Sequence, residues 1–585
     1  MSTVETTTLL DQPHHDGSEL YLLERPAELG DEAVVRLRIP KAQSVDRVLL
    51  RYDRDGEPRG LDATLDEETE TDAWWRASFP CWNPVTRYRW LLSGGDVGYA
   101  WVNALGCTPH EVTDADDFVV TAGRQPPAWH LESVVYQIFP DRFATSGFDV
   151  EAPEWAIRRS WDELPTGRGK PTPFELYGGD LRGIEQHLDH IESLGANLVY
   201  LTPFFPATSS HRYDATTFAH VDPLLGGDDA LRSLTAAAHA RGIRVIGDIT
   251  LNHTGFRHEW FVKAKRDPSS PERSFYIFDD AIPNGYEAWL GIPSLPKLDW
   301  RGDELRRRFA EVLHRYLDMG LDGWRVDVAN MVGRYRDVDL NRDVSRWARE
   351  QLGDDALLIA EHGHDFRPDL GVRGWHGVMN YSGFLRPLWT WLLRDDPEPE
   401  QRKQFWGIQV GVPQLDGVAS VSAMRRFRAG VPWESVLHSW NLLDSHDTAR
   451  FRTIAGTSDR HLVGIGLQMT VPGVPMMFAG DELGLEGAWG EDARRTMPWG
   501  AVHEDEFFER VRALVHLRRT LAPLARGGIR WAHVDADTIA YLRETPDERL
   551  LCVASREPID ALPVQFPSLE PVYDSPQFQI WRIHG

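Results

Sequence analysis

Cysteine is scarce in this sequence of 585 residues. Only Cys81, Cys107 and Cys552 occur, far apart in the chain and outside any CxxC pair. This spacing suggests neither a disulfide framework nor a zinc knuckle. We therefore expect reduced, buried thiols.

Long apolar runs are also missing. No stretch approaches the roughly 20 apolar residues that a membrane-spanning helix needs. The first 20 residues carry acids and histidines, without the basic start and apolar run of a signal peptide. These absences predict a cytoplasmic protein that has no contact with a membrane.

Basic side chains are few compared with acidic ones. The chain has 63 Lys and Arg against 89 Asp and Glu, which gives a formal net charge of −26. A field of this sign repels phosphate backbones and anionic membrane surfaces. Nucleic acid is therefore not an expected partner.

Tryptophan, by contrast, is abundant. There are 23 of these residues in a chain that is otherwise ordinary for a soluble globular protein, at 42% hydrophobic and 26% charged. Most of them belong in cores. Flat apolar rings also stack on sugar faces, so the count favours a carbohydrate site.

The chain is too long for one compact core and divides into three parts by pattern. Short alternating runs such as 32–40 and 45–53 predict an N-terminal β-sandwich domain over residues 1–125. Short strands return after a helix that ends near residue 521, and predict a small C-terminal β-sandwich domain over residues 524–585.

Between them, residues 126–523 alternate apolar runs of strand length with amphipathic helices, which is typical of a parallel sheet built from βα units. One helix is predicted from Asp180, a good N-cap, to Gly195, a good terminator. Eight strands are expected, at 134–140, 198–203, 243–249, 321–328, 357–361, 377–381, 438–444 and 474–480.

Eight such strands predict an α/β fold, a (β/α)8 TIM barrel, with an insertion at about 254–300 after the third strand. The alternative is an open doubly wound sheet. That fold would want a glycine-rich phosphate loop after an early strand, and the sequence has none.

Polar residues gather at the carboxyl ends of four of these strands, where the active sites of such barrels lie. Each has an ordinary structural explanation when taken singly, such as an Arg325–Asp327 ion pair. Buried charge at four strand ends is costly without a function. The set is Asp248, Asn252, His253, Arg325, Asp327, Glu361, His446 and Asp447.

Two carboxyl groups provide what cleavage of a bond between sugars requires, a proton donor and a nucleophile or base. Arg325 lies two residues before Asp327, so both side chains share one face of the strand. There the guanidinium can keep the Asp327 carboxylate ionised and oriented, as a nucleophile requires.

Four segments, 248–253, 323–330, 359–364 and 442–447, resemble in order the signature segments of the α-amylase family of glycoside hydrolases. Surrounding stretches resemble its neopullulanase, cyclomaltodextrinase and maltodextrin-glucosidase branch. The resemblance covers residues 130 to 520.

The resemblance implies retaining hydrolysis of α-glucosidic linkages, α-1,4 and also α-1,6, in short malto-oligosaccharides. Asp327 is then the nucleophile, Glu361 the acid/base and Asp447 the residue that stabilises the distorted sugar. It also implies substrate-binding roles for Tyr213, Asp248, His253, Arg325, His446 and Arg494.

Three positions depart from the family pattern. Gly363 replaces an aromatic residue, which either widens the leaving-group side or leaves the space to His362 or His364. Gly490 replaces an aspartate beside Arg494, and Asp492 is a candidate substitute. Met331 replaces a glutamate of the neopullulanase branch, which leaves the product size open.

No cofactor is expected to be required, and no metal ligands are assigned. Relatives with a calcium site carry several Asn and Asp residues after the first barrel strand, where this chain keeps only Asp149 with Asp180. Asn252 has an alternative role in structural hydrogen bonding.

Other functions on the same fold stay open. A transglycosylating enzyme uses the same residues, and a catalytically inactive binding subunit is disfavoured because all three acids are present. The branch resemblance also implies a homodimer, in which the N-terminal domain of one subunit covers the barrel mouth of the other. The choice among linear, cyclic and branched substrates, and between maltose and glucose as product, is not determined.

Overall fold

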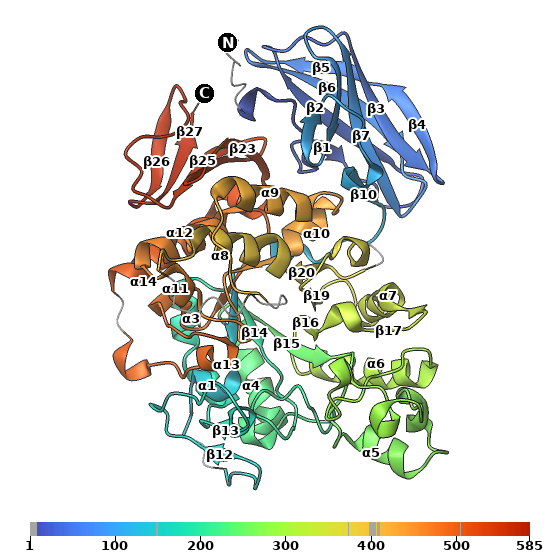
Figure 1. Ribbon diagram of the computed structural model, residues 1–585, viewed down its shortest axis with the longest axis vertical. Coiled ribbons are helices and arrows are strands. Elements are labelled where there is room, and N and C mark those ends of the chain that lie inside the picture. Colours follow the sequence, from blue (N-terminus) through green and yellow to red (C-terminus); the bar gives the residue numbers. More distant parts are fainter. Residues whose placement is uncertain are drawn as a thin grey trace.

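The computed structural model describes residues 9–147, 150–371, 374–396, 405, 410–502 and 505–584. A β/α barrel forms the body of the molecule, and two β-rich units lie side by side over one end of it (Figure 1). The N-terminal unit and the C-terminal unit are thus neighbours in space although they stand at opposite ends of the chain.

The N-terminal unit is the expected sandwich of two antiparallel sheets. The alternation predicted for β3 is present, with Val48, Leu50 and Tyr52 buried between the sheets. One sheet has the order β1 (Leu22–Glu24), β2 (Glu32–Pro40), β6 (Asp72–Pro80) and β5 (Thr64–Glu68). The other has the order β4 (Glu57–Asp62), β3 (Arg47–Arg54), β7 (Val85–Gly94), β8 (Gly98–Asn103) and β9 (Gly106–Thr108), with β10 (Phe118–Thr121) also paired to β7.

All eight predicted barrel strands are present, and they close into a parallel barrel in chain order. The last strand pairs with the first, so the sheet has no free edge. Every strand is buried, which explains why each was visible as a continuous apolar run. The strands are β11 (Val135–Ile138), β14 (Leu198–Leu201), β15 (Arg244–Thr250), β16 (Gly323–Asp327), β19 (Leu357–Glu361), β20 (Gly377–Met379), β21 (Trp440–Leu442) and β22 (Val474–Phe478).

Helices surround the barrel. The helix predicted between Asp180 and Gly195 divides at His187, whose ψ of 18° interrupts it, into α2 (Leu181–Gln186) and α3 (Leu188–Leu194). Asp180 accepts a hydrogen bond from Gly183 N as the predicted N-cap, and Gly195 ends α3 at a φ of 93°. The other helices are α1 (Pro140–Phe143), α4 (Gly227–His239), α5 (Glu259–Arg266), α6 (Asp303–Leu317), α7 (Asn341–Leu352), α8 (Arg386–Leu392), α9 (Gly417–Arg428), α10 (Trp433–His438), α11 (Phe451–Ala455), α12 (Ser458–Thr470), α13 (Gly490–Ala493), α14 (Glu506–Thr520) and α15 (Ala522–Arg526).

The segment between β15 and α6 carries α5 and several 3₁₀ turns. It returns to the barrel mouth through an isolated antiparallel bridge between His253 and Lys297. This bridge places residues of the segment beside the end of β15.

The C-terminal unit is a β-domain, but its described residues form one sheet rather than the two of a sandwich. The order is β23 (Gly528–Val534), β24 (Thr538–Glu544), β25 (Arg549–Ser555), β27 (Phe578–Ile583) and β26 (Leu569–Asp574). One face packs into the barrel core, where Phe578 lies against Gly466 of α12. Apolar side chains of the loop at 559–566 cover the other. The barrel core on one face and the loop on the other thus cover the sheet, where we had expected a second sheet.

Among the helices of the described residues, none has the length and apolar character required to cross a bilayer.

Candidate active site

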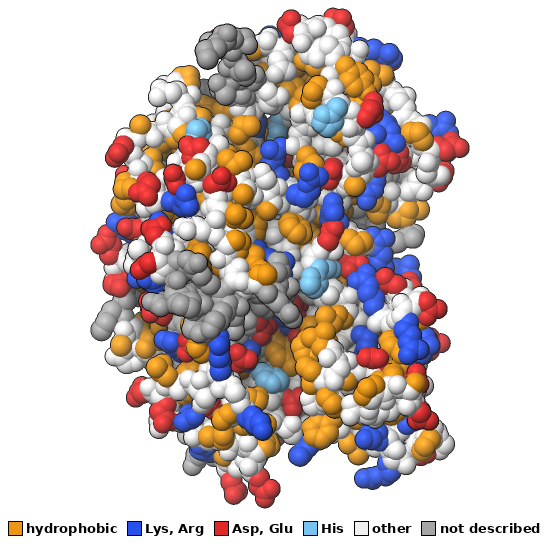
Figure 2. All heavy atoms as spheres, viewed as in Figure 1, with side chains coloured by type: hydrophobic (Ala, Val, Ile, Leu, Met, Phe, Trp, Pro, Cys, Tyr) orange, Lys and Arg blue, Asp and Glu red, His pale blue; other side chains and the backbone are white. Residues whose placement is uncertain are grey.

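The predicted site residues meet at the carboxyl ends of the barrel strands. Asp248 lies in β15 opposite Arg325 of β16, and Asp327 and Glu361 are the last residues of β16 and β19. Asp447 follows β21. Figure 2 shows a hollow in the face of the molecule turned to the viewer, with acidic and histidine side chains at its edge.

Arg325 is the centre of the cluster and is completely buried. Its Nη1 atom lies 2.9 Å from Asp248 Oδ2 and 3.2 Å from Asp327 Oδ1. Its Nη2 atom lies 3.0 Å from Glu361 Oε2. One guanidinium therefore contacts three carboxylates from three adjacent strands, and this contact fixes Asp327 and Glu361 relative to each other.

The backbone between these strands adds a second hold on Glu361. Val328 N donates a hydrogen bond of 2.7 Å to Glu361 Oε2. Val328 has a φ of 37°, a left-handed conformation that a β-branched residue rarely adopts. Strain of this kind persists where the surrounding structure enforces it, commonly at active sites. The oxygen Oε1 of Glu361 has no hydrogen-bond partner among the described residues, so it is available to carry a proton.

Asp447 lies on the other side of the site and is the most accessible of the three acids, with its side chain 26% exposed. Arg494 Nη2 donates to Asp447 Oδ1 at 2.9 Å, and Arg494 Nε donates to the carbonyl of His446 at 2.6 Å. Arg494 thus holds both the acid and the backbone that carries it.

Hydrogen bonds define the state of His446. Gln137 Nε2 lies 2.8 Å from His446 Nδ1 and can only donate there, so Nδ1 is the acceptor. The proton of the neutral ring is then on Nε2, which lies 2.7 Å from Tyr213 Oη and 3.1 Å from Asp447 Oδ2. Burial, together with the charge of Arg494, lowers the pKa of His446 to about 3, so the ring is neutral.

Tyr213 connects this histidine to the arginine cluster. Its hydroxyl donates to Asp248 Oδ2 at 2.9 Å, and Tyr200 donates to the same oxygen at 2.6 Å. The ring of Tyr213 is stacked against that of His446, with centroids 5.7 Å apart. Asp248 therefore holds the hydroxyl groups of Tyr213 and Tyr200 in position, together with the guanidinium of Arg325.

His253 is on the side of the nucleophile candidate. Its Nε2 atom lies 3.8 Å from Asp327 Oδ2 and is buried without a hydrogen-bond partner among the described residues. Burial and the charge of Lys297 lower the pKa of His253 to about 3. A neutral imidazole with a free nitrogen at this position can bind a sugar hydroxyl.

The direction of the pKa shift separates Asp447 from Asp327 and Glu361. Burial and the negative charge of Glu361 raise the pKa of Asp327 well above its ordinary value, and burial also raises the pKa of Glu361 against the opposing effect of Arg325. Acids in such a pair titrate together, and the pair keeps a proton at pH values where an exposed carboxyl has lost it. Burial also opposes ionisation of Asp447, but His446 and Arg494 outweigh it, and the pKa of Asp447 is lowered.

The departure at Gly490 has a structural explanation, and the candidate substitute Asp492 has another partner. A Cβ atom at Gly490 would lie 2.8 Å from the carbonyl oxygen of Asp447, so no side chain fits there without a backbone shift. Asp492 does not replace the missing acid, because it pairs with Arg495 at 3.0 Å and accepts a hydrogen bond from Ala488 N. Arg494 therefore pairs with Asp447 and not with Asp492.

Around Gly363, His362 Nε2 pairs with Asp369 at 3.1 Å, while His364 is exposed. The ring of His362 is thus held by Asp369. Met331 lies at the rim, where its sulfur accepts a hydrogen bond from Trp289 Nε1 at 3.2 Å.

The residues considered for calcium are occupied by other partners. Asp180 caps α2 and accepts hydrogen bonds from the backbone and hydroxyl of Ser146, and Asp149 lies outside the described residues. The ammonium group of Lys297 bonds to Asn252 Oδ1 at 2.5 Å and to the carbonyl of Met331 at 2.9 Å. Within the described ranges, no group of three or more His, Cys, Asp or Glu residues could hold a metal ion.

Three contributors were not predicted. Gln137 was the most visible, as a polar residue inside the apolar run of the first strand. Tyr200 gave no signal, because tyrosine is common in strands. Lys297 reaches Asn252 only through the folding of the long segment after β15, which no local pattern encodes.

Comparison with known proteins identifies the family of the chain. The family model described as "Alpha amylase, catalytic domain" matches residues 137–351. The chain is 32% identical over 446 residues to a cyclomaltodextrinase from a Bacillus species, with 74% of each chain covered. It is 31% identical over 544 residues to neopullulanase 2 of Thermoactinomyces vulgaris, which covers 88% of this chain and 86% of that protein.

A solved structure is also similar, that of a cyclic α-maltosyl-(1→6)-maltose hydrolase from Arthrobacter globiformis. Its TM-score is 0.64 at 30% identity, over 74% of this chain and 92% of that chain. The resemblance drawn from the four segments is thereby confirmed. Identity at this level over most of each relative shows that the chain belongs to the α-amylase family of glycoside hydrolases.

Proposed function

We propose that the protein hydrolyses α-glucosidic linkages in short malto-oligosaccharides with retention of the anomeric configuration. Asp327 is the nucleophile, Glu361 the acid/base and Asp447 the residue that stabilises the distorted sugar. The observation that carries the proposal is the contact of one buried guanidinium, that of Arg325, with both Asp327 and Glu361.

The first half of the reaction follows from this arrangement. Asp327 attacks the anomeric carbon and forms an ester bond to the sugar, while the glycosidic bond breaks. Its electron pair goes to the leaving oxygen, which takes a proton from Glu361 Oε1. A retaining enzyme needs its two carboxyls only about 5–5.5 Å apart, and the shared arginine is compatible with such closeness.

The second half reverses these roles. Glu361 removes a proton from a water molecule, the water oxygen attacks the anomeric carbon, and the ester bond to Asp327 breaks. Loss of the first proton leaves Glu361 ionised beside Arg325, which stabilises that state. A sugar hydroxyl in place of water gives transglycosylation through the same steps.

Substrate binding is assigned to the surrounding residues. Arg494 and His446 orient Asp447, His253 offers a neutral ring nitrogen to a hydroxyl group, and Tyr213 supplies a flat ring. We include α-1,4 and α-1,6 linkages and cyclic or branched chains, because the names of the relatives cover cyclomaltodextrins, pullulan and a cyclic maltosyl-maltose.

Proton NMR of the first product tests the stereochemistry. With maltotriose or a cyclomaltodextrin as substrate, the new reducing end should appear first as the α-anomer and then mutarotate. Initial release of the β-anomer would refute retention. Chromatography of the same samples identifies maltose or glucose, and products longer than the substrate would show transglycosylation.

We further propose a cytoplasmic homodimer in which the sandwich of one subunit covers the barrel mouth of the other. Free thiols at Cys81, Cys107 and Cys552 agree with a reducing compartment. Light scattering at micromolar concentration should give about twice the chain mass of 66.5 kDa. A monomeric mass would contradict the dimer and leave the chemistry untouched.

A further inference from the structure

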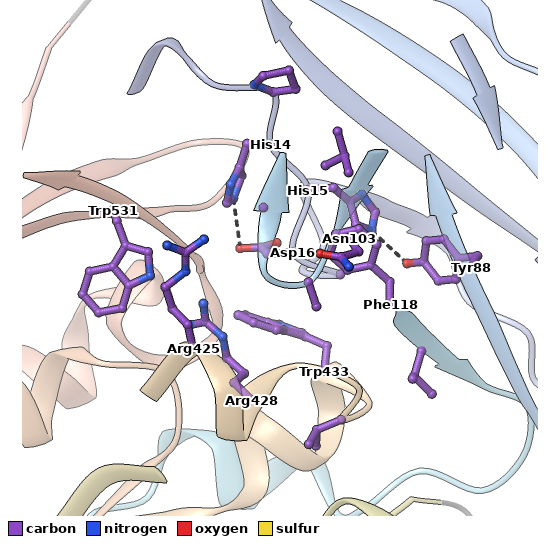
Figure 3. Close-up of a pocket in the computed structure, with 17 residues that line it drawn as sticks. His14, His15, Asp16, Tyr88, Asn103, Phe118, Arg425, Arg428, Trp433 and Trp531 are labelled. Atoms are coloured by element: carbon purple, nitrogen blue, oxygen red, sulfur yellow. Dashed lines mark hydrogen bonds and ion pairs between the residues drawn. The ribbon is translucent and has the colours of Figure 1, made fainter. Parts of the chain in front are cut away.

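A cavity lies where the three units of the molecule meet, and none of the three acids of the candidate active site lines it. Its walls come from the N-terminal sandwich, from α9 and α10 of the barrel, and from β23 of the C-terminal sheet (Figure 3). It offers about 70 Å³. Because one water needs roughly 10–15 Å³, the cavity has room for a small ligand.

Two arginines of α9 extend into this space toward Asp16 (Figure 3). The guanidinium of Arg428 makes no hydrogen bond or ion pair with any described residue, and that of Arg425 donates only to the carbonyl of Leu105. Burial lowers the pKa of Arg428 to about 10, so it remains a cation at neutral pH. Both arginines are half-buried, so solvent compensates the unpaired charge only in part.

Two indole N–H groups line the same cavity. Trp433 is 5% exposed and Trp531 is 8% exposed, and the Nε1 atom of each is buried without a hydrogen-bond partner in the described structure. Leaving a buried donor unsatisfied costs about 1–3 kcal/mol. The cavity therefore presents several hydrogen-bond donors that lack acceptors.

Asp16, the acid in the cavity wall, does not accept hydrogen bonds from these arginine and indole donors. Asp16 accepts hydrogen bonds from Ser18 N at 3.0 Å and Ile529 N at 2.8 Å. Burial opposes its ionisation, but His14 and the Ser18 contacts outweigh burial and lower the pKa of Asp16 to about 2. No ion pair joins Asp16 to either arginine. Two cations against one anion leave an excess positive charge.

We propose that this cavity binds a small tetrahedral oxyanion of the size of inorganic phosphate. Its oxygens would accept hydrogen bonds from the guanidinium groups of Arg425 and Arg428 and from the indole N–H groups of Trp433 and Trp531. Such an ion has five non-hydrogen atoms, fewer than half the number in a glucose unit. The ligand needs only acceptors, which an oxyanion provides.

Such a ligand would act on the whole molecule. Its donors come from α9, α10 and β23, and the sandwich closes the cavity from above (Figure 3). An anion bound there stabilises the docking of the three units, because a ligand that binds only the folded state raises the unfolding temperature. The net charge of −26 makes non-specific phosphate binding unfavourable, so saturable binding is diagnostic.

Calorimetric titration of the full-length protein with sodium phosphate, against sodium chloride at equal ionic strength, tests the proposal. We expect saturable phosphate binding and a rise in unfolding temperature that chloride does not cause. Arg428→Gln should weaken binding at least tenfold. Arg426→Gln is the matched control, since Arg426 is an exposed residue of the same helix that pairs with Asp116, and it should bind as the wild type does.

Trp531→Phe keeps the ring and removes only the N–H, so it should weaken phosphate binding severalfold in a folded protein. The proposal is overturned if the wild type shows no saturable binding, because water alone then fills the cavity. It is also overturned if Arg428→Gln and Trp531→Phe both bind with unchanged affinity, because phosphate then binds at another place. Tighter binding of glucose 1-phosphate than of phosphate would overturn the assigned ligand size.

Discussion

At the scale of single residues, the candidate acid/base is defined by which of its oxygens is free. Glu361 Oε2 is held by Val328 N and Arg325, so a proton on the group belongs on Oε1. Glutamine at this position keeps the shape and loses the proton.

We predict that Glu361→Gln lowers kcat on maltotriose by about 10²–10⁴-fold, the usual contribution of general acid–base catalysis. A glycosyl fluoride, whose leaving group needs no proton, should be affected less in the first step. Glu350→Gln, a change of an exposed residue on α7, is the control. Equal losses on both substrates would remove Glu361 from the role of proton donor.

Gly490 leaves room for the backbone of Asp447, a residue of the site. A methyl group there meets the backbone of Asp447 at 2.8 Å, whereas a methyl group at Gly500 meets nothing within 4 Å. A displacement of about 1 Å in a catalytic group can cost on the order of 10²-fold in rate.

We therefore expect Gly490→Ala to reduce kcat/KM by about 10–100-fold through displacement of Asp447, with a small change in stability. Gly500→Ala should be neutral in the same assay. Wild-type activity in Gly490→Ala would show that the Asp447 segment tolerates the shift.

At the scale of elements, the segment after β15 is joined to the barrel by Lys297. This ammonium group connects Asn252 at the end of β15 to Met331 after β16. The ammonium group places a positive charge at the end of β15.

Lys297→Met should leave two buried oxygens without a donor and lower the free energy of unfolding by about 1–3 kcal/mol. Urea denaturation measures this, with Lys170→Met at an exposed position as the control. Chelation with EDTA should change neither the activity nor the denaturation midpoint of the wild type. A loss of activity that calcium restores would show that a metal site exists.

The elements also show what a sequence can and cannot predict. The eight strands were identifiable because fully buried parallel strands are continuous apolar runs. Their ends were less certain, as for the run at 134–140, of which only Val135–Ile138 is strand, because the ends depend on pairing with neighbours. The break at His187 and the single C-terminal sheet depend on packing between distant segments.

In the site, too, some residues were predictable from local patterns and others depend on contacts between distant segments. Asp327, Glu361 and Asp447 stood at strand ends, so the barrel topology brought them together. Lys297 was not visible, because its partner Asn252 is 45 residues away in the chain.

At the scale of the whole molecule, buried neutral histidines link stability to pH. Burial lowers the pKa of His258, His438 and His461 to about 3. Unfolding restores a value near 6.5. Their contribution to stability is therefore present above about pH 6.5 and is lost as the pH falls toward 3, because only the unfolded chain binds the protons.

His461 of α12 isolates this effect, since neither ring nitrogen has a hydrogen-bond partner among the described residues. Below about pH 6, each such group should contribute about 1.4 kcal/mol per pH unit to the loss of stability. His461→Leu should reduce the slope by that amount between pH 6 and 4, while substitution of the exposed His110 should not. Equal slopes in wild type and His461→Leu would contradict the neutral buried ring.

The barrel, the two β-domains and the arginine cluster together lead to one claim, that Asp327 forms a covalent bond with the sugar. The most direct test is to trap that bond with a slow glycosyl fluoride substrate and locate it by peptide mass spectrometry. We predict one added glycosyl group per chain, on the peptide that contains Asp327, and none in Asp327→Asn. An adduct on another residue, or rapid turnover with no adduct and inverted product, would contradict the account.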